Sequence, residues 1–136
     1  MTADKLDLEI VTPERRVLSE TAEEVVLPGS EGYFGVLPGH APLLAALGVG
    51  EVSYRAGDRT RFLVVSGGFA EVLDNRVSVL AETCERAEEI DVDRANRSKQ
   101  AAEGDLDRRE ISESEFRMAE VRLKRAIARI EVTRHL

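Results

Sequence analysis

The sequence has few of the residues that build catalytic or metal centres in small proteins. Its 136 residues include one cysteine, two histidines and no tryptophan. A single cysteine excludes an internal disulfide and is typical of a reducing compartment, so we expect Cys84 to be a small buried apolar side chain. Two histidines are too few for the convergent ligand set of a jelly-roll metalloenzyme. We therefore predict no catalytic and no metal-binding residue in this chain.

Long apolar runs and an excess of positive charge are also absent. No stretch approaches the roughly 20 apolar residues that cross a membrane, and the N-terminus has the pattern of neither a secretory signal nor a transit peptide. The net charge is −7, whereas general nucleic-acid binding needs a basic face. We predict a soluble cytoplasmic protein that binds no nucleic acid and reaches a membrane only through a partner.

Proline is scarce, and three of the four prolines lie in one apolar segment, "VLPGSEGYFGVLPGHAPLL", from Val26 to Leu44. Pro-Gly occurs in it twice, and this pair is typical of tight turns. The segment lacks the Gly-Lys-Ser/Thr of a phosphate-binding loop, and Ser66 lacks the context of a nucleophile elbow. We predict a rigid corner at one end of a β-sandwich. The glycines at 67–68, within an apolar run, predict a bulge or a close backbone approach.

Residues 1–84 show the two-residue period of β-strands. Leu6, Leu8 and Ile10 alternate with acidic residues, as in a half-buried strand. Turn residues at 56–58 and 74–75 separate apolar runs and predict two hairpins. Repeated short strands at this spacing favour an antiparallel sandwich or barrel. We predict about ten antiparallel strands, with segments at 6–10, 17–18, 24–27, 33–36, 42–44, 51–54, 61–65, 69–73 and 77–80.

Residues 85–136 change to a helical composition, with no proline and one glycine. Asp91 is a helix N-cap candidate, and we expect the first helix to run to about Glu103 before Gly104 ends it. Ser112 and Glu115 match a capping box at the start of a second helix. One face of that helix is predicted to be apolar through Phe116, Ala119, Leu123, Ile127 and Ile130. The prediction is an antiparallel two-helix hairpin that must pack on the sandwich or on a partner.

The end of the second helix is basic in an otherwise acidic protein. Residues 117–136 carry six basic and two acidic side chains. An amphipathic basic helix favours an acidic partner. The other interpretation is a solvated helix face.

Three segments together resemble the epsilon subunit of the bacterial F-type ATP synthase. They are "VVLPGSEGYFGVLPGHAPLLAAL", "FLVVSGGFAEVLDNRVSVLAE", and the helical pair "IDVDRA" and "AEVRLKRAIARI". The resemblance implies a non-catalytic rotor subunit at the cytoplasmic face of the bacterial cell membrane. Its implied partners are the gamma subunit, the c-subunit ring and the alpha/beta hexamer. Glu31, Tyr33 and His40 are the implied rotor contacts.

The resemblance also implies a regulatory hairpin. Folded on the sandwich, the hairpin permits ATP hydrolysis; extended along gamma, it inhibits hydrolysis through the basic residues Arg122, Lys124 and Arg125. No cofactor is required, and ATP is implied as a regulatory ligand of the folded hairpin, because "IDVDRA" matches the motif Ile/Leu-Asp-x-x-Arg-Ala. The implied ATP-binding residues are Glu85, Ile90, Asp91, Arg94, Ala95, Arg125 and Arg129. Alternatively, Asp91 is only an N-cap and Arg94 only a surface ion-pair partner.

A different function class remains open at this point. A free-standing β-sandwich that binds carbohydrate or peptide, with a coiled-coil tail, has the same order of elements. Such sugar-binding modules present exposed aromatic side chains, whereas this chain has two tyrosines and four phenylalanines, most of them inside predicted strands.

Overall fold

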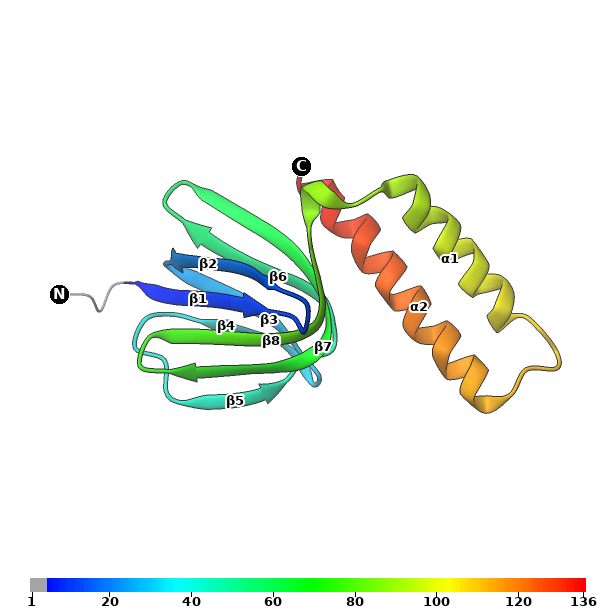
Figure 1. The fold of residues 1–136 in the computed structure, drawn as a ribbon, viewed down its shortest axis with the longest axis horizontal. Helices are drawn as coiled ribbons and strands as arrows, with labels where there is room; N and C mark the ends of the chain where they lie inside the picture. Colours follow the sequence, from blue (N-terminus) through cyan, green and yellow to red (C-terminus); the bar gives the residue numbers. More distant parts are fainter. Residues whose placement is uncertain (1–4) are drawn as a thin grey trace.

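Short apolar strands fold into a β-sandwich, and the Ala-, Glu- and Arg-rich segment after them folds into two antiparallel helices (Figure 1). The computed structural model describes residues 5–136. The strands are β1 Leu6–Val11, β2 Arg16–Ala22, β3 Glu24–Gly29, β4 Gly32–Val36, β5 Leu43–Ala46, β6 Val49–Ala56, β7 Arg59–Leu73 and β8 Arg76–Arg86. The helices are the 3-10 turn η1 Ala87–Glu89, α1 Val92–Leu106, α2 Glu113–Val132 and the 3-10 turn η2 Thr133–His135.

The strands form one continuous hydrogen-bonded sheet that folds over on itself, in the order β2-β1-β8-β7-β6-β3-β4, with β5 paired to β7. The described residues contain eight strands and not about ten, because the segments predicted at 61–65 and 69–73 are two parts of β7. The pairing is also not antiparallel throughout, since β1 and β8 run parallel. The first part of β7 pairs with β6 and the second part with β5. The domain boundary that we predicted after Cys84 falls inside β8.

Gly67 and Gly68 let β7 continue through the point where it bends. Both have positive φ, 71° and 110°. The pairing with β8 keeps the same register on both sides of them, so the segment is a close backbone approach and not a bulge. A Cβ atom at Gly68 would overlap the carbonyl oxygen of Leu80. Only glycine combines this conformation with this approach.

The main core lies between the layers of the sandwich and is made mostly of aliphatic side chains from seven of the strands, together with Tyr54. Its largest fully buried members include Leu6, Leu8, Ile10 and Leu27. Cys84 belongs to this core, as predicted, and burial raises the pKa of its thiol to about 11. The Cys84 thiol is therefore neutral and unreactive near neutral pH.

The helices begin where the sequence indicated and differ in how they continue. Asp91 caps α1 and Ser112 caps α2 in a capping box, both as predicted. However, α1 runs through Gly104 to Leu106, because an isolated glycine costs a helix only about 1 kcal/mol. The predicted apolar face of α2 is partly wrong, since Phe116 is 40% exposed.

The helices pack on one another through small side chains. The buried residues of this helix pair are four alanines and one valine, Ala95, Ala102, Ala119, Ala126 and Val132. Alanine allows a close approach of the two helices but buries little apolar area.

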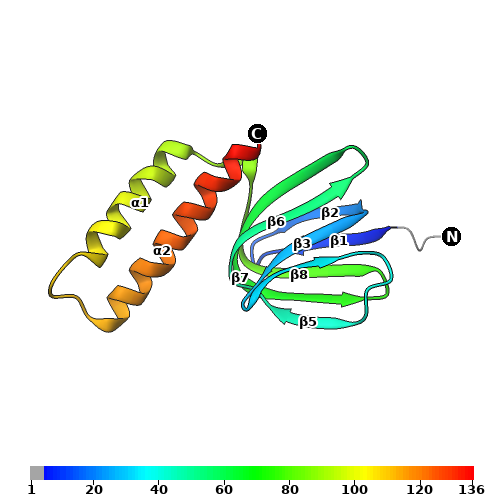
Figure 2. The same cartoon turned by 180° about the vertical axis from the view of Figure 1, so that it is seen from behind.

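The hairpin is folded onto the sandwich through α2, which contacts β6 and β7 (Figures 1 and 2). Only the end of α2 near the C-terminus lies against the sandwich, whereas the loop between the helices lies away from it. A small second core joins the two parts there, with Val64 from β7, Ala87 from η1 and Val132 from α2. The structure is therefore the docked form of the hairpin.

Candidate functional site

A cavity of about 240 Å³ lies where the end of β8, η1, the start of α1 and the last turn of α2 meet. The side chains around it come from both parts of the chain, so only the docked hairpin forms the complete cavity. Six of the seven residues predicted to bind ATP line it, and Arg125 does not. The lining residues are Glu85, Glu89, Ile90, Asp91, Arg94, Ala95, Ser98 and Arg129.

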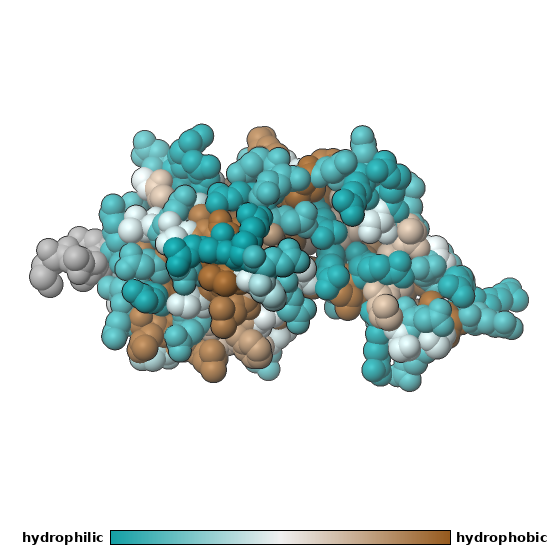
Figure 3. Space-filling view, viewed as in Figure 1, coloured by the Kyte–Doolittle hydropathy of each residue, from teal (hydrophilic) through white to brown (hydrophobic). Residues whose placement is uncertain are grey.

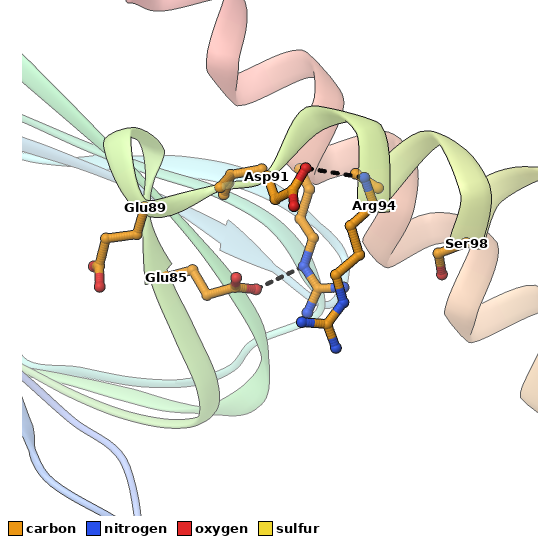
Figure 4. A pocket seen from close by; sticks show the side chains of 8 residues that line it. Glu85, Glu89, Asp91, Arg94 and Ser98 are labelled. Atoms are coloured by element: carbon orange, nitrogen blue, oxygen red, sulfur yellow. Dashed lines mark hydrogen bonds and ion pairs between the residues drawn. The ribbon is translucent and has the colours of Figure 1, made fainter.

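The first turn of α1 presents a positive helix end to this cavity. Asp91 accepts a hydrogen bond from the backbone N–H of Arg94, 3.1 Å from Oδ1, and so is an N-cap as well as a lining residue. The Arg94 side chain points toward the same space as Glu85 (Figure 4). Arg94 forms no ion pair with any residue in the range 5–136, against the alternative of a surface ion pair. A free guanidinium beside a helix N-terminus can hold an anion.

Glu85 and Arg129 close the cavity on the side of the sandwich. Arg129 Nε donates a hydrogen bond to Glu85 Oε1 over 2.6 Å, and this ion pair joins β8 to α2 (Figure 4). Both side chains are about one-third exposed, so solvent screens the pair in part. The cavity is lined by three carboxylates and two guanidiniums, so the positive charge that it offers to an anion lies at Arg94 and Arg129.

Arg125, which the resemblance implied as an ATP-binding residue, lies outside the cavity lining. Its Nε donates a hydrogen bond over 2.8 Å to the Ser66 hydroxyl on β7, and Ser66 is only 3% exposed. Arg125 and Arg129 do lie on one face of α2, but Arg129 reaches β8 and Arg125 reaches β7. Arg125 therefore ties the hairpin to the sandwich.

Two lining residues were missed by the sequence analysis. Ser98 lies one helical turn after Arg94 and shares its face of α1, so helical periodicity could have indicated it. Glu89 lies in η1, and no sequence pattern pointed to it. Its side chain turns away from Arg94 (Figure 4).

Two family models together match nearly the whole chain. The family model described as "ATP synthase, Delta/Epsilon chain, beta-sandwich domain" matches residues 5–87, and "ATP synthase, Delta/Epsilon chain, long alpha-helix domain" matches residues 88–134. The chain belongs to the ATP synthase delta/epsilon chain family.

Relatives at high identity carry the same family name. The ATP synthase epsilon chain of Nitratidesulfovibrio vulgaris (strain DP4) is 52% identical over 128 residues, which are 93% of this chain and 94% of the relative. That of Syntrophobacter fumaroxidans is 49% identical over 134 residues, 96% of each chain. The predicted function, a non-catalytic epsilon-type subunit of an F-type ATP synthase, is confirmed at this level, and the free-standing binding module has no support.

Solved structures show the same fold. A chain of the Euglena gracilis mitochondrial ATP synthase superposes with a TM-score of 0.83 at 23% identity, covering 92% of this chain and 79% of that one. A chain of the Tetrahymena thermophila mitochondrial ATP synthase, in a structure of its central stalk and c-ring, gives 0.67 at 16% identity, covering 98% and 99%.

The three basic residues of α2 that were predicted to inhibit hydrolysis differ in their contacts in the docked hairpin. Arg122 donates a hydrogen bond to Asp105 of α1 over 2.7 Å. Lys124 is exposed and forms no ion pair with residues 5–136. Because Arg125 is bound to Ser66, the three residues of the predicted inhibitory set have three different surroundings.

The three predicted rotor contacts are not brought together. Glu31 lies in the turn between β3 and β4, next to Tyr33, whereas His40 follows the opposite end of β4. The Tyr33 hydroxyl accepts a hydrogen bond from the backbone N–H of Glu51, 2.9 Å away. His40 Nδ1 lies 2.6 Å from the Ala41 carbonyl oxygen. The segment from Val26 to Leu44 is therefore not a corner at one end of the sandwich. It contains most of β3, all of β4 and the start of β5.

An exposed apolar patch covers the outer face of β5, β7 and β8 (Figure 3). Phe69 and Leu80 are direct cross-strand neighbours on β7 and β8, 56% and 61% exposed. Leu44 of β5 lies diagonal to Phe69 and is 71% exposed. No sequence pattern singled out this patch, because strand alternation alone does not tell which face is covered.

Residues 5–136 contain no cluster of three or more histidine, cysteine, aspartate or glutamate side chains placed to hold a metal ion. None of the helices described for this chain is long and apolar enough to span a membrane.

Proposed function

We propose that this chain is a rotor subunit of a proton-translocating F-type ATP synthase, in which the sandwich couples rotation of the c-subunit ring to gamma and the alpha/beta hexamer. The observation that carries the proposal is the match of both family domains, in order, over residues 5–134. The chain is held peripherally at the cytoplasmic face of the bacterial cell membrane by these partners.

The apolar patch of Leu44, Phe69 and Leu80 is the proposed gamma-binding surface. Large exposed apolar side chains side by side mark interaction sites on soluble proteins. The docked hairpin leaves this patch uncovered (Figure 3). Structural neighbours of the chain come from ATP synthase assemblies, which supports a stalk subunit as the occupant.

Replacing Phe69 with glutamate is expected to abolish stable binding to gamma. Burying an unpaired charge in an apolar interface costs several kcal/mol, which lowers affinity by about 100-fold or more. The measurement is co-purification and titration of the full chain with gamma. The matched control is Thr60→Glu on the exposed start of β7, outside the patch. Equal binding by both variants would contradict this surface.

We further propose that the docked hairpin binds ATP in the cavity and that the extended hairpin inhibits ATP hydrolysis. Arg94, Arg129 and the N-terminus of α1 offer positive charge to phosphates, and the carboxylates of Glu85 and Asp91 offer acceptors to hydroxyl and amino groups. At about 240 Å³ the cavity holds only part of a nucleotide, so the remainder extends into solvent.

ATP then acts as a conformational ligand and not as a substrate. Its site has one wall on β8 and another on α2, so binding favours the docked form by mass action. At about 100 times the dissociation constant this amounts to roughly 2.7 kcal/mol. A hairpin that buries mainly alanine can be held or released by a free energy of this size.

Arg94→Ala is expected to weaken ATP binding by about 10-fold to 100-fold, because a charge-assisted bond to phosphate contributes roughly 1.5–3 kcal/mol. The measurement is isothermal titration of the full chain. Arg97→Ala removes the same charge from α1 outside the cavity and should leave the affinity nearly unchanged. Arg125→Ala should lower affinity only through weaker docking. No heat at millimolar ATP with wild-type protein would contradict ATP binding.

A further inference from the structure

The turn η2 fastens the hairpin to two strands of the sandwich. His135 Nε2 lies 2.9 Å from Glu51 Oε1 on β6. The same imidazole stacks on the Phe62 ring of β7, with centroids 3.7 Å apart and an interplanar angle of 8°. Two different side chains on neighbouring strands therefore hold one histidine.

The strand side of this contact is itself held in place. The backbone N–H of Glu51 is bound by the Tyr33 hydroxyl, and Phe62 packs against the second core of Val64, Ala87 and Val132. The histidine thus meets a preformed site on the sandwich. These contacts hold the hairpin on the sandwich together with the Arg125–Ser66 hydrogen bond and the Arg129–Glu85 ion pair.

We propose that His135 is a pH-sensitive latch that holds the hairpin on the sandwich more tightly when it is protonated. A charged imidazolium donates a charge-assisted hydrogen bond to the Glu51 carboxylate and is attracted to the face of the Phe62 ring. Histidine is the side chain that ordinarily changes charge between about pH 5 and pH 8. The latch requires neither ATP nor a partner subunit.

Other charged groups also lie around η2. From β6 the facing group is the carboxylate of Glu51, and from β7 it is the uncharged Phe62. The turn η1, which also contacts η2, carries Glu88 and Glu89, and Glu89 is paired with Arg15 and Arg86. Glu131 on α2 adds a further carboxylate, and Arg61 and Arg134, the chain neighbours of Phe62 and His135, bring the positive charge. The Glu51 carboxylate is the charged group in direct contact with the imidazole, and the proposed latch depends on that contact.

Amide hydrogen exchange of α2 in the full chain tests the latch. In a released hairpin α2 keeps only its contacts with α1, which bury mainly alanine, so exchange of its amides reports undocking. Rates are divided by those of an unstructured chain at each pH. In the wild type, protection of the α2 amides is expected to fall by roughly two-fold to five-fold from about pH 6 to about pH 8. His135→Gln, which cannot carry the charge, should show no such fall.

Two further variants separate charge from packing. His135→Phe keeps the stack on Phe62. Protection of its α2 amides should be independent of pH and close to the protection that the wild type shows at high pH. Arg134→Gln changes the neighbouring charge and should keep the pH dependence. If the wild type shows no pH dependence, or His135→Gln keeps the wild-type dependence, His135 is not the latch.

Discussion

Replacing Gly68 with alanine is expected to lower the free energy of unfolding by about 2–4 kcal/mol. Gly68 has φ 110°, where residues with a Cβ are strained, and the new Cβ would overlap the carbonyl oxygen of Leu80. Relief requires β7 and β8 to separate where β7 changes partner from β6 to β5. Equilibrium unfolding in urea measures the change.

Gly57→Ala is the matched control for Gly68→Ala. Gly57 also has positive φ, 63°, but a Cβ there meets no atom within 4 Å. The control isolates the backbone strain, which costs roughly 1–2 kcal/mol. If both variants lose the same free energy of unfolding, the close approach at Gly68 adds nothing to the destabilisation by Gly68→Ala.

A chain that ends after Ala87 is expected to fold cooperatively, to bind gamma and to relieve the inhibition of ATP hydrolysis completely. The main core lies within the strands, whereas the helices share with the sandwich only a small second core. The proposed gamma-binding patch is also retained. The measurements are thermal unfolding of the shortened chain and the ATP hydrolysis rate of the reconstituted complex.

A full-length variant with Arg122, Lys124 and Arg125 replaced by alanine should relieve the inhibition only in part. Each exposed ion pair with an acidic partner contributes about 0.2–1 kcal/mol, and salt screens it, so the relief is clearest at low ionic strength. Arg125→Ala alone also frees Ser66 and so loosens docking.

Two results for the chain that ends after Ala87 would contradict the division of roles between sandwich and hairpin. One is aggregation of the shortened chain, and the other is inhibition of ATP hydrolysis as strong as that by the full chain.

Features that depend on a few neighbouring residues followed from the sequence. Asp91 and Ser112 cap their helices because a side-chain oxygen three residues before a free N–H suffices. Asp74 and Asn75 make the β7–β8 turn with positive φ, which these short polar side chains tolerate. Ile90, Asp91, Arg94 and Ala95 line the cavity together because they lie close together at a helix start.

Features that depend on distant residues were decided only by the tertiary structure. The parallel pairing of β1 with β8 and the continuity of β7 across Gly67 and Gly68 are set by which strands meet, and local periodicity is the same for each arrangement. Arg125 reaches Ser66, 59 residues earlier in the chain, because α2 docks on β7. His135 likewise meets Glu51 and Phe62 only because α2 ends against β6 and β7. The sequence by itself determined most strand positions, the helix starts and the family, whereas packing between the two parts decided which charged side chains line the cavity and which fasten the hairpin.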